Sequence, residues 1–333
     1  MKKLGVIILN WNGKKLLEKF LPSIAANTIC DLADLIVADN GSDDGSLEWV
    51  RHNCKGVITL QFDRNYGFAE GYNRAIEACD YPYVVLLNSD VETTDGWWQP
   101  LLKILEENHD IGAIQPKILA YNNNKYFEYA GAAGGYLDKN GYPFCRGRLF
   151  DKVEEDSGQY DDGLSNITWA SGACLMTKRD LYLKLGGLDP LFFAHMEEID
   201  YCCRILNNGL RICATSESKV YHIGGASLNQ GNPKKTYLNF RNNLLLLHKN
   251  LPEKIGRRKL VIRRLYDSLA FIMFVLKMDF ANAKAILSAH KDFKTMRKNY
   301  TVYPEKDILC KQPGANHNIV IEHYLLGNNI IKI

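Results

Sequence analysis

The sequence has the composition of an ordinary globular protein: 333 residues, of which 46% are hydrophobic and 24% charged. A chain of this length can bury a sizeable core and holds one large domain or two smaller ones. No uninterrupted apolar segment approaches the roughly 20 residues needed to cross a bilayer, which argues against a membrane-spanning protein.

The charge is distributed unevenly. The net charge is only +3, but residues 251–300 contain 12 Lys or Arg and 4 Asp or Glu, a local charge of +8. The remainder of the chain therefore carries −5. Such asymmetry predicts that the C-terminal part faces an anionic surface.

Cysteine usage indicates a reducing compartment. The nine cysteines form no CxxC pair, and the apolar run after Met1-Lys2-Lys3 is too short for an export signal. We therefore expect a cytoplasmic protein without disulfides.

The first hundred residues alternate between strand and helix patterns. Apolar runs predict four strands, at Leu4–Leu9, Leu35–Asp39, Val57–Phe62 and Tyr81–Leu87. Helical spacing and capping residues predict helices at Lys14–Ala26, from Leu47 and at Phe68–Cys79. This order predicts an α/β fold with a doubly wound, mostly parallel sheet and right-handed crossovers.

The middle of the chain is less regular. A helix is expected at Asp95–Asn108 and a strand at Ile111–Gln115, but Tyr121–Ser165 shows no clear element and is expected to be a functional or disordered loop. Regular patterns return afterwards. Strands are expected at Ala173–Thr177, Arg211–Ala214 and Lys219–His222, and helices at Arg179–Leu185 and Glu197–Asn207.

The fourth strand ends in polar residues that suit a ligand site. Ser89 and Asp90 follow its buried run and should emerge at the carboxyl end of the sheet, where open α/β sheets bind ligands. A carboxylate there can hold Mg²⁺ or Mn²⁺ against a diphosphate. The alternative is that Asp90 only caps the next helix.

Two other strand ends offer candidate ligand contacts. Asp39 can accept a hydrogen bond from a nucleobase or a ribose hydroxyl, although an Asp in such a loop often only stabilises a turn. Asn65 and Gly67 follow the third strand, where a glycine allows a ligand to approach the backbone or simply forms a tight turn.

A cluster of acids begins the helix expected at 197–207. Glu197, Glu198 and Asp200 could be there only because the helix dipole favours them. Yet apolar residues precede them, and acids beside apolar groups tend to have raised pKa values, which suits a general base. The small residue Gly172 leaves room for a substrate or for a packed aromatic ring.

His222 and Arg241 are further candidates. His222 follows an apolar strand and precedes a Gly-Gly loop, so it could be structural or a metal ligand beside Asp90. Arg241 opens an apolar run and could contact phosphate or cap a helix.

The order and spacing of these segments resemble family 2 of the glycosyltransferases, which are inverting enzymes of GT-A fold. Val6–Gly13 is similar to the family's opening strand and loop, Val37–Ser46 to its nucleobase-binding loop, and Asn65–Asn73 to the segment after its third strand. Asn88–Asp90 resembles its DxD metal motif, and Gly187–Asp200 its acceptor-side helix. His222 and Arg241-Asn242 also fall at family positions.

The resemblance implies roles for individual residues. Glu198 and Asp200 are expected to be catalytic, with Glu198 at the position of the base, and Asp90 and His222 to bind the metal. The nucleotide sugar is expected to contact Asn10, Asn12, Asp39, Asn65, Gly67, Asn73, Ser89, Gly172 and Arg241. Two departures from the family pattern stand out: Asn88 replaces the first acid of DxD, as in members similar to bacterial rhamnosyltransferases, and Glu198 stands where Asp is common.

The last 80 residues lie outside the resemblance. Leu269–Leu276 is apolar all round, and a helical pattern with many lysines follows it. Such helices can lie on an anionic membrane, or they can pack on the catalytic domain with a solvated basic side.

The sequence thus predicts a catalytic domain at 1–250, with a nucleotide-sugar half (1–100) and an acceptor half (101–250), and a basic helical extension at 251–333. The resemblance implies a metal-dependent, inverting hexosyl- or deoxyhexosyltransferase that uses Mg²⁺ or Mn²⁺. It would move a sugar from a UDP- or dTDP-type donor to a hydroxyl of a cell-surface glycan or lipid-linked acceptor.

We expect the protein to act in the cytoplasm, at the inner face of the membrane, and without nucleic acid. Two alternatives are a catalytically silent nucleotide-sugar-binding subunit and a sugar-phosphate nucleotidyltransferase. The second would need a Gly-rich, basic phosphate loop after the first strand, which Asn10–Gly13 is not.

Overall fold

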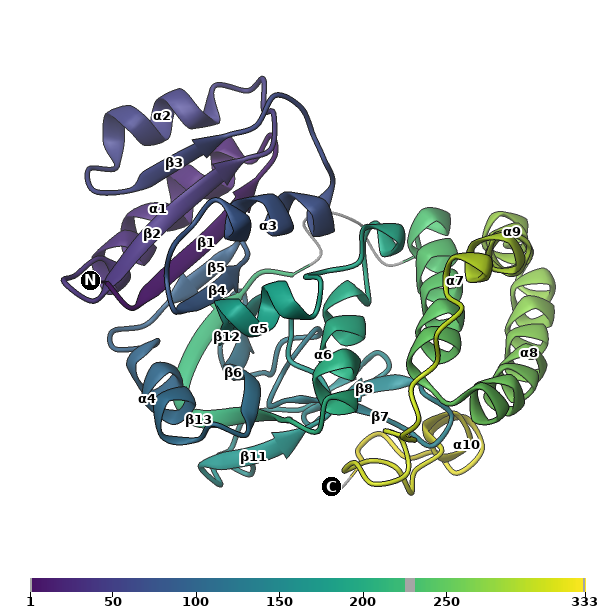
Figure 1. Cartoon of the computed structure of the whole chain (residues 1–333). Coiled ribbons are helices and arrows are strands. Elements are labelled where there is room, and N and C mark those ends of the chain that lie inside the picture. Colours follow the sequence, from purple (N-terminus) through teal and green to yellow (C-terminus); the bar gives the residue numbers. More distant parts are fainter. Residues whose placement is uncertain (1, 225–230, 332) are drawn as a thin grey trace.

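The computed structural model describes residues 2–224, 231–331 and 333. Its centre is a nine-stranded sheet in the order β11-β13-β6-β12-β4-β1-β2-β3, with β5 paired to β13 (Figure 1). The strands are β1 Leu4–Asn10, β2 Ala33–Asp39, β3 Ile58–Gln61, β4 Tyr83–Leu87, β5 Val91–Thr93, β6 Ile111–Ala120, β11 Leu164–Ile167, β12 Cys174–Lys178 and β13 Arg211–His222.

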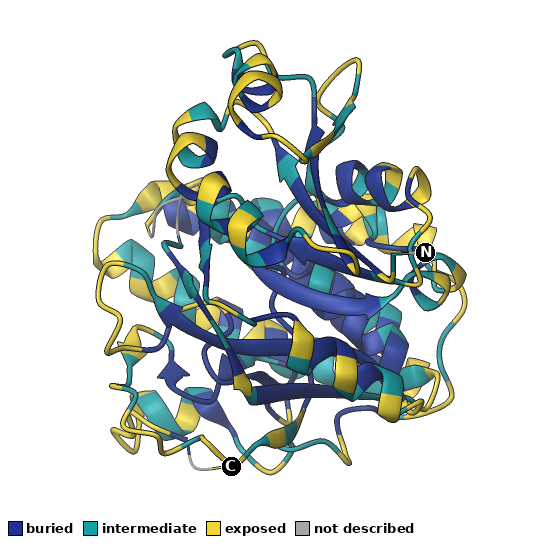
Figure 2. Cartoon of the chain, turned by 90° about the vertical axis from the view of Figure 1, so that its left-hand side faces the viewer, coloured by how far each residue is buried: buried dark blue, intermediate teal, exposed yellow. Residues whose placement is uncertain are grey.

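The N-terminal strands are parallel, as predicted. β4, β1, β2 and β3 run in the same direction, and the apolar residues of β4, β1 and β2 are mostly buried, whereas the edge strand β3 is partly exposed (Figure 2). In this register Asn10 lies directly beside Asp39. The carboxyl ends of these strands therefore bring their terminal polar residues to one edge.

The second half of the chain adds strands to the same sheet. β12 is antiparallel to both β4 and β6, and β13 runs parallel to β6. As a result, the start of β12 and the end of β13 reach the same edge as the ends of β1, β2 and β4. The mostly parallel sheet is confirmed, and the antiparallel insertion of β12 is what the strand-helix alternation did not predict.

Helices cover both faces of the sheet, which confirms the doubly wound arrangement. They are α1 Lys14–Thr28, α2 Ser46–Asn53, α3 Phe68–Glu77, α4 Gln99–Glu107, α5 Arg179–Lys184 and α6 Glu197–Asn207, with a 3₁₀ turn η1 at Pro190–Phe192. One core contains Phe20 of α1 and Leu101 of α4. The other contains Tyr72 of α3, Tyr182 of α5 and Ile205 of α6.

The prediction that 121–165 is a long loop without regular elements was wrong. This segment contains all four strands of a small sheet, β10-β9-β8-β7, and the start of strand β11. The small strands are β7 Gly135–Leu137, β8 Pro143–Cys145, β9 Arg148–Leu149 and β10 Lys152–Val153. Strands of two or three residues are too short to produce a detectable period. Their ordering comes from buried aromatic side chains such as Phe127, Tyr136 and Phe144.

The strands expected at 211–214 and 219–222 are one element. β13 runs through both, and its register against β6 shifts between Thr215 and Lys219. This irregularity interrupts the period-2 alternation of apolar and polar residues along the strand. The sequence pattern therefore shows two short runs where the structure has one strand.

The C-terminal helical region is confirmed. It consists of α7 Pro233–Asn250, α8 Glu253–Leu276, α9 Phe280–Met296, a 3₁₀ turn η2 at Arg297–Asn299, and α10 Ile319–Tyr324. α8 and α9 pack on α7, which packs on α6 (Figure 1). The final segment returns to the small sheet, where the Ile319 N–H donates to Asp138 Oδ2 at 3.1 Å.

Within the described residues no helix has the length and apolarity to cross a membrane. The nine cysteines, all in the described part of the chain, are free thiols.

Candidate active site

Asp39 lies at the end of β2 in a network of polar groups. Its side chain is 1% exposed, Oδ1 accepts from Asn10 Nδ2 at 3.0 Å, and Oδ2 accepts from the Ser42 N–H at 3.0 Å. Asn10 Nδ2 also donates to Ser46 Oγ at 2.8 Å. A carboxylate has about four acceptor positions, so Asp39 can accept further bonds from a ligand.

Asn12 and Asn65, both expected to contact the nucleotide sugar, hold the neighbouring loops in place through hydrogen bonds. Asn12 Oδ1 accepts from the Asp43 N–H at 2.9 Å, and Asn65 Oδ1 accepts from Asn40 Nδ2 at 3.0 Å and the Gly67 N–H at 2.7 Å. Gly67 has φ +81°, and a methyl group placed on it would meet nothing within 4 Å. The backbone at Gly67 thus borders open space at the carboxyl edge.

Ser89 lies near Asn10 across the opening. A Cβ atom added to Gly13 would lie 2.6 Å from Asn10 Oδ1 and 4.0 Å from Ser89 Oγ. The ends of β1 and β4 are therefore close at this point, and Gly13 is small because a side chain would strike Asn10.

Asp90 and His222 are brought together from positions 132 residues apart in the chain. His222 Nε2 lies 3.1 Å from Asp90 Oδ1, and both residues are 5% exposed. Asn88 Nδ2 lies 3.4 Å from the same ring nitrogen. The predicted proximity of the DxD-like segment to His222 is thus observed.

Glu128, which the sequence did not single out, completes this cluster. Its Oε1 atom lies 3.4 Å from His222 Nδ1, and its Oε2 accepts from the Ala130 N–H at 2.5 Å. A Cβ atom on Gly224 would approach Glu128 Oε1 to 2.5 Å, so glycine is required there for the contact. Burial lowers the pKa of His222, but Asp90 and Glu128 outweigh it and raise the pKa to about 10.

The pair Asp90–His222 fits a divalent cation. A carboxylate oxygen and an imidazole nitrogen 3.1 Å apart can both bind Mn²⁺ or Mg²⁺ once the cation displaces the proton of the imidazolium ring, and Glu128 can orient the ring through its other nitrogen. In the described part of the chain no three His, Cys, Asp or Glu side chains form a complete metal site. A cation here would therefore take its remaining ligands from water or from a bound phosphate.

Glu198 stands opposite Gly172. A Cβ atom on Gly172 would lie 3.7 Å from Glu198 Cβ and 3.8 Å from Phe68 Cζ. The adjacent Ala173 carbonyl accepts from the Asn88 N–H at 3.0 Å, which links Gly172 to the Asp90–His222 pair. Glu198 is therefore at the same edge as Asp39 and Asp90.

Two acids at the start of α6, Glu197 and Glu198, have raised pKa values. Burial raises the pKa of Glu198 to about 7, and burial together with the charge of Glu198 raises the pKa of Glu197 well above its usual range. The Oε2 atoms of both side chains are shielded from solvent and have no hydrogen-bond partner among the described residues. A carboxyl group with a pKa near 7 is suited to accept a proton at neutral pH.

Asp200 lies in a different environment. It is fully buried; its Oδ2 accepts from Arg204 Nε at 2.9 Å and Lys249 Nζ at 2.8 Å, and its Oδ1 from Asn250 Nδ2 at 2.8 Å. These contacts brace α6 against α7.

Asn73 and Arg241 also contact protein backbone. Asn73 holds the segment before η1, because it accepts from the Leu188 N–H at 2.9 Å and donates to the Leu188 carbonyl at 2.8 Å. Arg241 is 7% exposed and donates to the carbonyl of Phe192 at 2.7 Å and to that of Leu191 at 3.1 Å.

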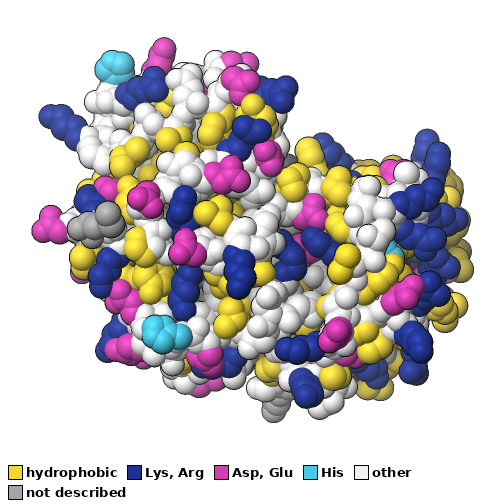
Figure 3. Space-filling model, viewed as in Figure 1, with side chains coloured by type: hydrophobic (Ala, Val, Ile, Leu, Met, Phe, Trp, Pro, Cys, Tyr) yellow, Lys and Arg dark blue, Asp and Glu magenta, His cyan; other side chains and the backbone are white. Residues whose placement is uncertain are grey.

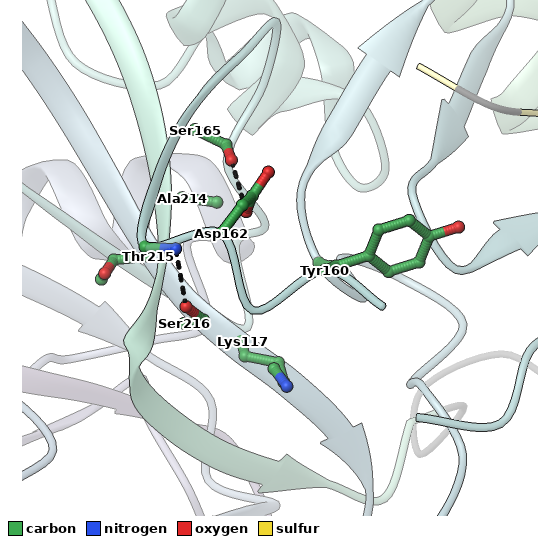
Figure 4. Close-up of a pocket in the computed structure, with 9 residues that line it drawn as sticks. Lys117, Tyr160, Asp162, Ser165, Ala214, Thr215 and Ser216 are labelled. Carbon is green, nitrogen blue, oxygen red and sulfur yellow. Dashed lines mark hydrogen bonds between the residues drawn. The ribbon is translucent and has the colours of Figure 1, made fainter. Parts of the chain in front are cut away.

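A water-sized cavity of about 10 Å³ lies between β6, β13 and the segment 160–165, lined by Lys117, Asp162 and Ser216 among others (Figure 4). None of the predicted site residues lines it. Most of the Gly-Gly loop that follows His222, residues 225–230, lies outside the described residues.

The fold and the positions of the candidate site residues define the class of the protein. Its fold is GT-A: the chain superposes on GalNAc-T7, solved with UDP, GalNAc and Mn²⁺, with a TM-score of 0.59 at 18% identity, over 74% of this chain and 48% of that one. It also superposes on TarS 1-349 of S. aureus, with a TM-score of 0.56 at 16% identity, over 87% and 80% of the two chains.

The family follows from the sequence match. The model of glycosyl transferase family 2 matches residues 5–182, more than half of the chain, and the protein belongs to this family. This confirms the resemblance inferred from the motifs.

Curated relatives are distant. The chain is 24% identical to the N-acetylglucosaminyl-diphospho-decaprenol L-rhamnosyltransferase of Mycobacterium tuberculosis, over 66% of this chain and 75% of that protein. It is 22% identical to the O-antigen biosynthesis protein RfbC of Myxococcus xanthus, over 68% of this chain. The match spans only 18% of RfbC, and 26% of a Sinorhizobium fredii relative of uncharacterized function.

Proposed function

We propose that this glycosyltransferase moves a hexosyl or deoxyhexosyl group from a UDP- or dTDP-type donor to a hydroxyl group, with inversion at the anomeric carbon. The acceptor would be a cell-surface glycan or a lipid-linked saccharide. The rhamnosyltransferase and O-antigen names of the relatives support this substrate class.

The observation that carries the proposal is the position of Glu198. It is a carboxyl group with a pKa raised to about 7, opposite a residue without a side chain and at the edge that also holds Asp39 and Asp90. Inversion requires one displacement, in which the acceptor hydroxyl attacks opposite the leaving diphosphate. Glu198 would accept the proton of that hydroxyl as attack proceeds.

The donor would bind along the ends of β1, β2 and β4. Asp39 would accept the imide N–H of uracil or thymine, in a pocket bordered by Asn10, Asn12 and Gly67. Asp90 and His222 would hold Mg²⁺ or Mn²⁺. A bound cation would supply Lewis-acid stabilisation of the leaving diphosphate.

Three residues expected at the substrate receive positioning roles instead. The contacts of Asp200, Asn73 and Arg241 are with protein groups, so we propose that they hold α6 and the segment 187–195 in place.

The C-terminal helices would bring the enzyme to an anionic membrane. Val261, Leu265, Leu269, Ile272 and Leu276, here called the α8 stripe, are 51–78% exposed. Their spacing of three or four residues places them on one helix face. Lys254, Arg257 and Arg258 extend the same face toward the start of α8. Basic side chains gather on the right-hand side of the surface, over the C-terminal helices (Figure 3).

The stripe argues against a purely packing role for α8. A helix whose only role is to pack on the catalytic domain would turn its large apolar residues inward, whereas α8 exposes these five. An apolar face beside basic residues is typical of a helix that lies in the membrane interface. A cytoplasmic enzyme bound there would meet lipid-linked acceptors.

The central test is Glu198→Gln, which keeps the shape of the side chain and removes its basicity. Turnover should fall by ~10²–10⁴-fold, the usual contribution of a general base. The donor Kd should stay within about threefold, a change under ~0.7 kcal/mol. Rates should be measured with Glu197→Gln as the matched control, since neighbouring residues on a helix point in different directions.

The pH profile provides a second readout. Because Glu198 must be ionised to accept a proton, kcat/KM of the wild type should fall below about pH 7 and be level above it. In Glu198→Gln this acidic limb should be absent. A variant that retains more than about a tenth of kcat, a loss below ~1.4 kcal/mol, would place the base elsewhere.

The same assay separates the enzyme from a silent nucleotide-sugar-binding subunit. A silent subunit would bind donor without either transfer or hydrolysis, whatever acceptor is offered.

A further inference from the structure

The segment between η1 and α6 has an unusual backbone. Phe193, His195 and Met196 have φ values of +66°, +67° and +71°, although none of them is glycine. At Phe193, with ψ −58°, the Ala194 N–H donates to the Phe192 carbonyl at 2.8 Å and forms the rare γ-turn with positive φ. Such a conformation persists only where surrounding contacts hold it.

The side chain of Asn242 contacts this segment at three backbone carbonyl groups. Asn242, on α7, is fully buried, and its Nδ2 donates to the carbonyl groups of Phe192 at 2.9 Å, Ala194 at 2.8 Å and His195 at 2.6 Å. An amide nitrogen has two hydrogens, so the three carbonyls share them. A single atom thus gathers three carbonyls of the strained segment.

Arg241 fixes the orientation of this amide. Its Nε and Nη2 atoms donate to Asn242 Oδ1 at 2.9 and 2.7 Å. The amide oxygen of Asn242 is therefore directed toward Arg241, and its nitrogen toward the segment 192–195.

The strained segment sets where α6 begins. Met196 is the N-cap residue of α6, and Glu198 is the second residue of the helix. Glu198 therefore lies in the first turn of α6, whose N–H groups have no partners within the helix, so the course of this turn depends on the segment before it. If the first turn unwound, Glu198 would lose its position opposite Gly172.

We propose that Asn242 is the positioning residue for Glu198: by gathering the carbonyls of residues 192, 194 and 195 it holds the backbone that directs Glu198 toward Gly172. This inference rests on the proposed role of Glu198 as the base.

The structure offers a matched control at the next position. Asn243 is also fully buried on α7, but its Nδ2 donates to the Gly141 carbonyl at 2.8 Å, in the small sheet. Asn243→Ala should cost folding stability as Asn242→Ala does, without disturbing the segment 192–196.

The experiment compares Asn242→Ala, Asn242→Asp and Asn243→Ala in the full chain. Both changes at 242 remove the N–H donors, and Asp also keeps the shape. Each should lower kcat by about 10²-fold, the effect of a misplaced catalytic group, while the donor Kd changes less than threefold. Asn243→Ala should keep kcat within threefold of the wild type, even if its melting temperature falls as much as that of Asn242→Ala.

A double variant separates this inference from the assignment of the base. If Asn242 acts through Glu198, adding Asn242→Ala to Glu198→Gln should lower kcat less than threefold further. A further loss as large as that in the wild type would overturn the inference, and so would an equal loss of kcat in Asn243→Ala. An active Glu198→Gln enzyme would instead refute the assignment of the base.

Hydrogen exchange gives a readout that does not depend on residual turnover. Amides 194–199 should exchange at least tenfold faster in Asn242→Ala than in the wild type, and should be unchanged in Asn243→Ala. Unchanged exchange in Asn242→Ala would also overturn the inference.

Discussion

At the scale of single residues, Asp39 is the buried carboxylate that we propose contacts the base of the donor. Its two oxygens are held by Asn10 and by the backbone of Ser42, so the direction of the side chain is fixed without a ligand. A group that is already oriented loses little entropy on binding. An ionised carboxylate can only accept, which would favour a base that presents an N–H.

We therefore predict that Asp39→Ala weakens UDP binding by about 10- to 100-fold, since hydrogen bonds to charged groups contribute ~1.5–3 kcal/mol. Calorimetry with UDP and CDP, with and without Mg²⁺, would measure this. Asp43→Ala, in the same loop but exposed, should bind UDP as the wild type does. Equal affinity of the wild type for CDP and UDP would contradict the imide assignment.

At the scale of elements, α8 has two different faces: one packs on neighbouring helices, and the other exposes apolar side chains to solvent. Its inner face is held to α7 by Arg263, whose Nη1 donates to Asn243 Oδ1, and to α9 by His290, whose Nε2 lies 2.8 Å from Asp267 Oδ2. Its outer face carries the α8 stripe. The helix is thus anchored to α7 and α9 while its large apolar residues point to solvent.

Replacing Leu269 and Ile272 by Gln should abolish recovery with anionic vesicles in a flotation assay. Both side chains are more than half exposed, so the free energy of unfolding should change by under ~0.5 kcal/mol for each. Leu32→Gln, an exposed leucine before β2, is the matched control. Each basic residue near the lipid surface is worth ~1 kcal/mol, so neutral vesicles should recover less protein than anionic ones.

Two outcomes of that assay would contradict the proposed membrane contact. Equal recovery with neutral and anionic vesicles at low salt would show that electrostatic attraction to anionic lipid does not contribute to the binding. A dimer that forms in solution and is lost in the Gln variant would show that the stripe binds a second copy of the chain instead.

At the scale of the whole molecule, the candidate metal site joins two distant parts of the chain. Asp90 follows β4 and His222 ends β13, and these strands are separated in the sheet by β12 and β6. A ligand that binds only the folded state stabilises it by about 2.7 kcal/mol at 100 times its Kd.

Mn²⁺ should therefore raise the melting temperature of the protein in the presence of UDP. Asp90→Ala should remain folded but lose this shift and its sugar transfer, whereas Asp95→Asn, an exposed acid nearby, should keep both. Full transfer activity after treatment with EDTA would refute the metal's role.

Apolar runs in the sequence were enough to predict strands β1–β4, β6, β12 and β13 and most of the helices, because long apolar periods report local burial directly. It also placed Asp39, Asp90 and His222 at one edge, since the ends of strands in a parallel sheet share that edge. The motif order was enough to indicate the family, which the comparison then confirmed.

The contacts of the site side chains became visible only in the folded structure. Glu128 comes from a segment without periodicity, so no sequence pattern could have placed it against His222. Asn242 looks like an ordinary polar residue in a helix, and its role depends on three carbonyls almost 50 residues earlier in the chain. Periodicity reports which residues are buried, whereas the partner of a buried polar group is set by packing between distant segments.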